Sequence, residues 1–595
     1  MADQDIFRGT AVSTGIAQGA AYVLTFAADH AAVPCRGIEP DEIEGEIARL
    51  EVALDKAERD LLALSKDVAA RVGSDEAEVF TAQALVARDH VFLGQVVSIV
   101  RDHRINVEAA VAEVVEKFTR TFDQITDPYL RERAADVRDV GRRLLGALTK
   151  SAGFDPSAIP EGSILVVDEL LPSAAALLDL GRVRALVSDR GGKFSHTSIL
   201  ARSMRLPAVT GLPDVTLGIK TGDALIVDGI SGVVFVNPGE GVLREYARLE
   251  GELRGYRDDL HKIVDLPAVT LDGTQIGLLA NARKLSDTEA ACLYKADGIG
   301  LYRTEFGFSV RAAFPTEEDQ YDILERAAAR IHPRKIVLRL LDVGGDKELP
   351  YMPLPVSRNP ALGQRGVRLL LRYPDILLGQ LRAFLRVSAD HPVSILLPVV
   401  GGLDEVRAVR RVIARAMEQL TAEGKRFNPE VPVGAMIEVP SAAVLAGALA
   451  REVDFLSLGT NDLVQYVLAA DRENETVADQ YRPHHPAVLH LIESVATAAR
   501  LAHCPLTICG EMAGAPEYTE LLIGLGLRTF SVAPGEMLEV KNAIRAVTLD
   551  AAAALAREVS GLGSVIEVEA ALERRRQQVA PGPTLAVVAL ARPAS

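Results

Sequence analysis

The chain has 595 residues, of which 48% are hydrophobic and 25% are charged. This length is too great for one hydrophobic core and predicts three or four domains of an ordinary globular protein. The formal net charge of −16 argues against nucleic acid or an anionic membrane as the main partner. No apolar run reaches the length of a membrane span, and the acidic first residues lack a signal-peptide pattern. Four cysteines in so long a chain do not form a disulfide framework, so we expect a cytoplasmic location.

The first part of the chain changes twice between strand and helix patterns. Short apolar runs punctuated by glycine predict one or two strands at residues 7–24, and strands alternating with helices from 163 to 236. Between them, apolar residues recur every three or four positions from about 39 to 148, which predicts a bundle of about four helices. We therefore expect one α/β domain into which a helical bundle is inserted.

The last large block has a regular strand–helix rhythm. Eight candidate strands, each followed by a helical segment, occur at Gln275–Ala282, Gly298–Tyr302, Lys335–Leu341, Val393–Val400, Val431–Val439, Asp454–Leu458, Pro505–Cys509 and Thr529–Val532. Alternation at that count predicts a (β/α)8 barrel, with a doubly wound open sheet as the alternative. The expected domains are 1–24 with 148–238 (α/β), 25–147 (helical bundle), 239–266 (helical linker rich in Glu and Arg), 267–550 (barrel) and 551–595 (C-terminal helical tail).

One histidine has neighbours that suit phosphate chemistry. His196 follows the glycine pair Gly191-Gly192, lies between the hydroxyls of Ser195 and Thr197, and precedes an apolar run that starts a predicted helix. Backbone N–H groups and the helix dipole at such a position favour an anion, above all phosphate. A neutral imidazole there is a candidate nucleophile that becomes phosphorylated. The alternative is a solvent-facing histidine near a helix cap.

Charged residues gather at the expected carboxyl ends of the barrel strands, where barrel enzymes carry their chemistry. Arginine forks bind phosphate and carboxylate bidentately, and two carboxylates supply hard oxygen ligands for Mg²⁺. A thiol at a strand end is a candidate proton donor or nucleophile. Singly, each charged group could be a rim ion pair or part of a solvated loop, and the thiol could be buried and inert. The candidates are Arg303, Arg339, Lys347, Arg365, Glu438, Asn461, Asp462, Arg472 and Cys509.

Six motifs of the chain resemble those of the phosphoenolpyruvate-utilising enzymes. Over nearly its whole length, the chain resembles the enzyme I family of the bacterial phosphotransferase system. The first is the histidine segment that begins at Gly191. The others are Asp127-Pro-Tyr-Leu-Arg-Glu-Arg-Ala-Ala-Asp-Val-Arg-Asp139, Gly298-Ile-Gly-Leu-Tyr-Arg-Thr-Glu-Phe306, Asp342-Val-Gly-Gly-Asp-Lys-Glu-Leu-Pro350, Ser457-Leu-Gly-Thr-Asn-Asp-Leu463 and Cys509-Gly-Glu-Met-Ala-Gly514.

The resemblance implies a phosphoenolpyruvate–protein phosphotransferase that carries the phosphoryl group on His196 and passes it to a histidine of the small carrier HPr, releasing pyruvate. It implies Mg²⁺ held by Glu438 and Asp462, and Cys509 as the proton donor. It also implies that the bundle docks HPr, that the barrel forms a homodimer, and that the histidine domain swings between bundle and barrel. The substrate ligands that it implies are Arg303, Arg339, Asn461, Asp462 and Arg472, with added positive charge from Arg365 and Lys347.

Two departures from the family pattern lie near the histidine. Phe194 stands where the family usually has threonine, and Ala175 replaces a threonine that commonly contacts the active histidine. We expect normal chemistry at the barrel and an altered phosphohistidine environment or choice of carrier. The alternatives are a paralogue serving a nitrogen-regulatory or dihydroxyacetone pathway, a catalytically decayed regulatory scaffold, and a dikinase or synthase of phosphoenolpyruvate. The last would need a nucleotide-binding domain, and no Gly-x-x-x-x-Gly-Lys-Ser/Thr loop is present.

Overall fold

In the computed structural model, the described part of the chain divides into two compact units, residues 6–256 and residues 257–578. The structure describes residues 6–578 apart from 25–33, 72–79, 81–82, 85–86, 89, 124–127, 150–155, 179–180, 192–197, 199–200, 203–205, 310–313, 346–348, 350, 353–358, 473 and 475. No helix in this described part is long and apolar enough to span a membrane.

The first unit contains an eight-stranded sheet with the strand order β1-β8-β7-β3-β4-β5-β6-β2. Strands β3 to β6 run parallel, and the outer strands pair antiparallel. Apolar residues on both faces form two separate core clusters, which explains why β4 reads as a continuous apolar run. The strands are β1 (Ile6–Arg8), β2 (Thr10–Ser13), β3 (Ile16–Leu24), β4 (Ser163–Val167), β5 (Val183–Ser188), β6 (Ala208–Thr210), β7 (Ala224–Asp228) and β8 (Val233–Val236).

The prediction of one or two strands at residues 7–24 was too low, because the segment forms three. Gly9 separates β1 from β2 where the backbone passes so close to its neighbours that a Cβ would lie 2.6 Å from the carbonyl oxygen of Thr210. Gly15, with φ 139°, makes the turn between β2 and β3. The one-residue break at Gly9 and the turn at Gly15 thus divide one short apolar run into three strands, with glycine at both positions.

The helical bundle lies in the same unit and has its own core. Leu54, Val96, Val111 and Leu144 are fully buried there, one from each of the long described helices. The three- and four-residue spacing of these apolar positions places them on one face of each helix, as the sequence predicts. The helices are α2 (Ile43–Arg71), α4 (His90–His103), α5 (Val107–Asp123) and α6 (Pro128–Thr149).

A buried carboxylate joins the bundle to the α/β part of the unit. Asp139 of α6 is fully buried and accepts hydrogen bonds from the backbone N–H of Ser173 (2.9 Å) and from its hydroxyl. Ser173 lies in the first turn of α7 (Pro172–Leu177), whose own N-cap residue, Leu171, has no side chain that could cap it. Gln83 donates to the same carboxylate at 3.3 Å. Asp139 therefore caps a helix of the neighbouring subdomain.

Asp139→Ala should lower the free energy of unfolding by about 2–3 kcal/mol, because it leaves a buried N–H and a buried hydroxyl without their charged acceptor. Asp139→Asn, which keeps one oxygen acceptor, should lose less. Urea unfolding of the full chain followed by circular dichroism measures both values. Asp60→Ala, on the exposed face of α2, is the control and should change little; an equal loss in both alanine variants would contradict this role of Asp139.

Helix α10 (Glu240–Lys262) continues the chain from the first unit into the second. Leu260 is its one buried residue, and its surface carries intrahelical ion pairs such as Arg254–Glu250 (3.1 Å) and Lys262–Asp259 (2.7 Å). At its beginning, the Tyr246 hydroxyl donates to Asp228 at 3.2 Å. The helix is thus held by local charge pairs along most of its length rather than by a core.

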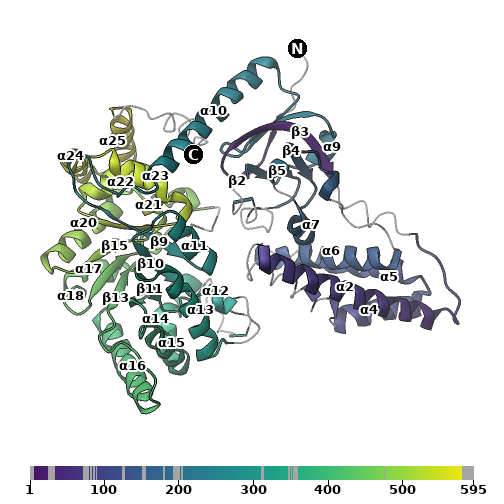
Figure 1. The fold of residues 1–595 in the computed structure, drawn as a ribbon, viewed down its shortest axis with the longest axis horizontal. Helices are drawn as coiled ribbons and strands as arrows, with labels where there is room; N and C mark the ends of the chain where they lie inside the picture. Colours follow the sequence, from purple (N-terminus) through teal and green to yellow (C-terminus); the bar gives the residue numbers. More distant parts are fainter. Residues whose placement is uncertain are drawn as a thin grey trace. The chain divides into compact units, whose positions relative to one another are not determined.

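The second unit is built on a closed eight-stranded parallel barrel, so the barrel prediction is confirmed and the open-sheet alternative is wrong (Figure 1). Strand β16 closes the ring by pairing with β9, with Thr529 opposite Gly277. Each of the eight predicted strands is present: six are shorter than predicted by one to four residues, β16 has the predicted bounds, and β10 extends one residue further, to Arg303. The strands are β9 (Gly277–Ala282), β10 (Gly298–Arg303), β11 (Lys335–Arg339), β12 (Val393–Leu397), β13 (Val433–Ile437), β14 (Phe455–Leu458), β15 (Leu506–Ile508) and β16 (Thr529–Val532).

Helices surround the barrel, and the last two extend it. Helix α24 packs against α22, and Arg575 of α25 forms an ion pair with Glu520 of α22 at 2.7 Å. The helices are α11 (Leu285–Leu293), α12 (Phe306–Ser309), α13 (Glu317–Ile331), α14 (Gly366–Arg372), α15 (Pro374–Val387), α16 (Leu403–Ala422), α17 (Pro440–Val444), α18 (Ala446–Leu449), α19 (Thr460–Leu468), α20 (Pro486–Leu501), α21 (Glu511–Gly514), α22 (Pro516–Gly524), α23 (Met537–Arg545), α24 (Leu549–Ser560) and α25 (Val565–Gln578).

Candidate active site

The carboxyl ends of the barrel strands bring together most of the predicted site residues. Because all eight strands are parallel, these ends lie on one face of the barrel. The positions are Arg303 and Arg339 at the last residues of β10 and β11, Glu438 directly after β13, Asn461 and Asp462 in the first turn of α19 after β14, and Cys509 directly after β15.

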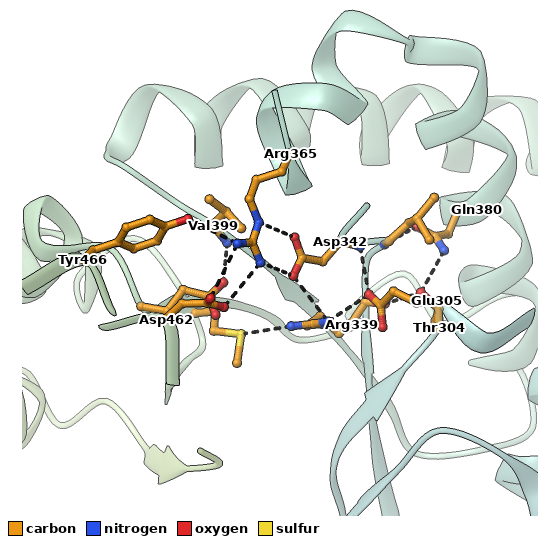
Figure 2. Close-up of polar contacts among 12 residues, drawn as sticks. Thr304, Glu305, Arg339, Asp342, Arg365, Gln380, Val399, Asp462 and Tyr466 are labelled. Atoms are coloured by element: carbon orange, nitrogen blue, oxygen red, sulfur yellow. Dashed lines mark hydrogen bonds and ion pairs between the residues drawn. The ribbon is translucent and has the colours of Figure 1, made fainter. Parts of the chain in front are cut away.

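A buried arginine lies between two carboxylates on this side of the barrel (Figure 2). The Arg365 guanidinium donates to both oxygens of Asp342, at 3.2 Å from Nε and 2.9 Å from Nη2. It also contacts Asp462 at 3.4 and 3.5 Å, and Nη1 donates to the Tyr466 hydroxyl at 3.2 Å. Burial alone would lower the pKa of Arg365, but the charges of Asp342 and Asp462 outweigh it and raise the pKa. The guanidinium is therefore permanently charged and fixed in orientation.

Glycines shape the loop that carries this arginine. Gly344 has φ 96° and pairs as a β-bridge with Arg365. A Cβ on Gly344 would lie 2.1 Å from the carbonyl oxygen of Gln364, so no other residue fits this close approach without a backbone shift. The Gly344-Gly345 pair that the sequence motif contains is thus required by the contact between the two loops.

Two further arginines, Arg303 and Arg339, lie buried at the ends of β10 and β11. Arg339 is 4% exposed and donates from Nη2 to Glu305 at 2.8 Å, and the neighbouring carboxylates raise its pKa against the effect of burial. Burial, then the charges of Arg339 and Arg283, lower the pKa of Arg303. The Nε atoms of Arg303 and Arg339 are buried without a hydrogen-bond partner among the residues that the structure describes. Unpaired buried cationic donors of this kind point to an anionic ligand.

Glu438 is a buried carboxylate beside other carboxylates. Its side chain is 1% exposed, and its Oε1 accepts a hydrogen bond from the backbone N–H of Val399 at 2.6 Å. Val399 holds φ 54°, a left-handed conformation that β-branched residues rarely adopt. Burial, followed by the charges of Asp462 and Asp342, raises the pKa of Glu438 to about 7. A cation bound between Glu438 and Asp462 would relieve this repulsion.

The amide of Asn461 ties two strand ends together. Asn461 Nδ2 donates to Glu511 at 3.0 Å, and its Oδ1 accepts from the backbone N–H of Glu511 at 2.8 Å. The Tyr481 hydroxyl donates to the carbonyl oxygen of Asn461 at 3.1 Å. Burial raises the pKa of Tyr481 to about 12, while the adjacent Arg472 opposes the rise. Arg472 therefore lies beside Tyr481, the residue that contacts Asn461.

The thiol of Cys509 lies inside the barrel among apolar side chains. It is 1% exposed, and its Sγ is 3.2 Å from the hydroxyl of Ser457 and 3.5 Å from the carbonyl oxygen of Leu458. Burial raises the pKa of Cys509 to about 11, so the thiol keeps its proton at neutral pH. A protonated thiol is suited to donate a proton rather than to attack as a nucleophile.

Several groups of the site were not predicted as site residues. Glu305 and Asp342 orient the arginines, and both lie within quoted motifs, so the motifs contained a signal for them. Asn281, which donates to the carbonyl oxygen of Cys509 at 3.1 Å, carries no signal in the sequence. The same is true of Tyr466 and Tyr481, which reach the site from helices and loops beyond the strand ends.

Three sequence predictions fall on residues that the structure does not describe. His196 and Phe194 lie within 192–197, and Lys347 lies within 346–348. Ala175 is described and lies in α7, whose N-terminal turn Asp139 caps. Within the described ranges, no three His, Cys, Asp or Glu side chains form a metal-binding group. The roles assigned to these residues from the sequence stay predictions.

The described arrangement combines three chemical capabilities on one face of a barrel. Arginine donors without partners can hold a small anion with several negative oxygens. Two carboxylates can share a divalent cation with that anion. A buried protonated thiol can deliver a proton to a carbon or oxygen of the bound molecule.

Comparison with known proteins agrees with this chemistry. Residues 8–133, 159–232 and 257–549 match the family models of the N-terminal, mobile and PEP-binding domains of PEP-utilising enzymes. The phosphoenolpyruvate-protein phosphotransferase of Geobacillus stearothermophilus is 38% identical over 569 residues, 95% of this chain and 97% of the relative. The Haemophilus influenzae protein of the same name is 38% identical over 565 residues, with 95% and 98% coverage. That of Enterococcus faecalis is 37% identical over 576 residues, with 96% and 99% coverage. The chain therefore belongs to the phosphoenolpyruvate-protein phosphotransferase family of PEP-utilising enzymes.

Proposed function

We propose that this chain takes the phosphoryl group of phosphoenolpyruvate onto His196, releases pyruvate, and passes the phosphoryl group to a histidine of the carrier HPr. The main support for this proposal is the pair of buried Nε donors on Arg303 and Arg339. They lie at the same end of the barrel as the thiol of Cys509. Phosphoenolpyruvate offers a phosphate and a carboxylate to such donors and a carbon that needs a proton after phosphoryl transfer. One ligand therefore accounts for both features.

The proposed reaction has two covalent steps. The bond between phosphorus and the enol oxygen breaks as a bond forms from phosphorus to a ring nitrogen of His196, which leaves the enolate of pyruvate. The enolate carbon then takes the proton of the Cys509 thiol, and the resulting thiolate regains a proton from water. The arginines stabilise the negative charge that moves through both steps.

Mg²⁺ fits this site. Glu438 and Asp462 would hold the ion, because Mg²⁺ commonly takes one or two carboxylates and completes its shell with substrate oxygens and water. Burial, followed by the charges of Asp462 and Asp342, raises the pKa of Glu438, which supports a carboxylate group there that a bound cation would stabilise. When bound, the ion would neutralise charge on the phosphoryl group and the enolate.

The partners in this proposal follow the family. The bundle of α2, α4, α5 and α6 would dock HPr, and the barrel unit would form a homodimer. The mobile-domain family model covers residues 159–232, which include His196, and this supports a histidine domain that moves between bundle and barrel. The expected setting is sugar uptake by a cytoplasmic phosphotransferase system.

A labelling experiment tests the proposal. The wild-type chain, incubated with ³²P-labelled phosphoenolpyruvate and Mg²⁺, should acquire acid-labile label and transfer it to added HPr. His196→Ala should acquire none, and chelation of Mg²⁺ with EDTA should reduce labelling of the wild-type chain to background. Unlabelled wild-type protein that is folded and supplied with Mg²⁺ would contradict the proposed function. Label that stays on the chain would support the barrel chemistry and exclude HPr as the carrier.

A further inference from the structure

The surroundings of Cys509 contain one hydroxyl group whose presence the fold alone does not explain. Ser457 lies in β14 and is 1% exposed. Cys509, which its hydroxyl contacts, belongs to an apolar cluster with Leu301, Val337, Leu396 and Met436. Among the described residues, the Ser457 hydroxyl has one hydrogen-bond partner, the Cys509 sulfur at 3.2 Å. Burying a hydroxyl against a weak sulfur acceptor costs stability relative to alanine, so this contact calls for a functional reason.

The geometry assigns a direction to this hydrogen bond. The Cys509 thiol has a second acceptor, the carbonyl oxygen of Leu458 at 3.5 Å, toward which its proton can point. The Ser457 O–H is then the donor, and its hydrogen points at the sulfur. A hydroxyl that donates to sulfur binds a thiolate more strongly than a thiol, because hydrogen bonds to charged acceptors are the stronger ones.

We propose that Ser457 is a positioning residue for the Cys509 proton donor, and that it holds the sulfur in place and stabilises the thiolate left after proton transfer. This inference rests on the proposed function. In the step concerned, the S–H bond of Cys509 breaks and a C–H bond forms at the enolate carbon. The electron pair of the S–H bond stays on sulfur, where the Ser457 O–H and the nearby Arg303 and Arg339 stabilise it. Water then returns the proton to sulfur.

Independent contacts hold the rest of the cysteine. Asn281 donates from Nδ2 to the carbonyl oxygen of Cys509 at 3.1 Å, and Asn281 in turn accepts from the Ser531 hydroxyl at 2.8 Å. The backbone of Cys509 is therefore fixed without Ser457. Removal of the Ser457 hydroxyl should leave the position of residue 509 intact and change only the sulfur and its proton.

The test separates proton transfer from phosphoryl transfer. Ser457→Ala should label His196 from ³²P-phosphoenolpyruvate in a single turnover at a rate within about threefold of wild type. Pyruvate formation should slow about tenfold or more, since a hydrogen bond to a charged group has that effect. Phosphoenolpyruvate bearing deuterium and tritium in defined positions at the reacting carbon gives a second measurement. Wild type should yield a methyl group of one configuration, and Ser457→Ala should yield a largely racemic one because the enol is released and protonated in water.

Substitutions at Ser457 and at Ser388 serve as controls for this test. Ser457→Thr, which keeps a hydroxyl donor, should stay near wild type in pyruvate formation and configuration, and Ser457→Gly replaces the alanine variant if that variant does not fold. Ser388→Ala removes a buried hydroxyl directly after α15 that donates to the carbonyl oxygen of Leu385 and accepts from the backbone N–H of Asn428, and it should match wild type in pyruvate formation. Unchanged pyruvate formation and configuration in Ser457→Ala, with a labelled wild type, would overturn this inference alone. A wild type without label would overturn the proposed function and this inference together.

Discussion

Arg365→Met is expected to lower kcat/KM for phosphoenolpyruvate at least a thousandfold. Methionine keeps most of the side-chain volume but removes the charge that Asp342 and Asp462 share (Figure 2). Asp342 is fully buried, so it would either take up a proton or repel Asp462 out of place. A coupled assay that follows pyruvate release measures the loss. Arg365→Lys keeps the charge but not the bidentate geometry of the guanidinium, and its kcat/KM should fall about ten- to a hundredfold.

Two variants distinguish the chemical role of Arg365 from its role in folding. Arg365→Met with Asp342→Asn should recover much of the unfolding free energy lost in the single variant, because the unpaired buried charge is gone. It should not recover activity. Arg368→Met, one turn along α14 with a half-exposed ion pair to Glu405 at 3.5 Å, is the matched control and should keep its activity. Full activity of the double variant would show that Arg365 acts only in folding.

Glu438→Gln is expected to lower kcat at least a thousandfold. Glutamine has nearly the same shape and can still accept the hydrogen bond from Val399, but it has no charge to attract Mg²⁺. The loss should not be reversed by raising the Mg²⁺ concentration within the millimolar range. Glu430→Gln, an exposed substitution just before β13, is the control for the loss of one negative charge. Retained activity in Glu438→Gln would exclude Glu438 as a metal ligand.

The same variant should be more stable than wild type at high pH when no metal is present. Burial and the charges of Asp462 and Asp342 raise the pKa of Glu438 from 4.5 to about 7, so the folded wild type binds more protons than the unfolded chain in that interval. Its free energy of unfolding must then fall as the pH rises from about 4.5 to 7. Glutamine has no such dependence. Relative to wild type, Glu438→Gln should gain up to about 3 kcal/mol between pH 5 and pH 8 in urea unfolding. An equal difference at both pH values would contradict this.

The sequence predicted the barrel well because each strand is a short buried apolar run bounded by polar loops. Gly277–Ala282 and Val433–Ile437 illustrate this, since neither could continue as an amphipathic helix. The N-terminal segment was harder to predict. Its three strands are separated by Gly9 and Gly15, and the need for glycine at position 9 comes from close packing against Thr210 and Leu212, which lie two hundred residues away along the chain.

Only part of the site could be predicted, because only some of its residues lie at strand ends. Strand ends are local features, so Arg303, Arg339 and Cys509 could be placed from the sequence alone. The groups that orient them come from distant segments. Asn281 reaches Cys509 across 228 positions, and no local pattern marks such a contact. Ser457 is a small residue in an apolar strand, and only the folded barrel shows that its hydroxyl faces the thiol.

Because helix α10 is exposed, the connection that it makes between the two units can change its length. Between Tyr246, which contacts Asp228, and the buried Leu260, no residue of the helix is buried. Unwinding these thirteen or so residues exposes no apolar core, so local opening there requires little free energy. Each residue would lengthen from about 1.5 Å of helical rise to about 3.4 Å of extended chain, which adds about 25 Å to the tether. Local unwinding of α10 can therefore lengthen the connection between the two units without unfolding the core of either one.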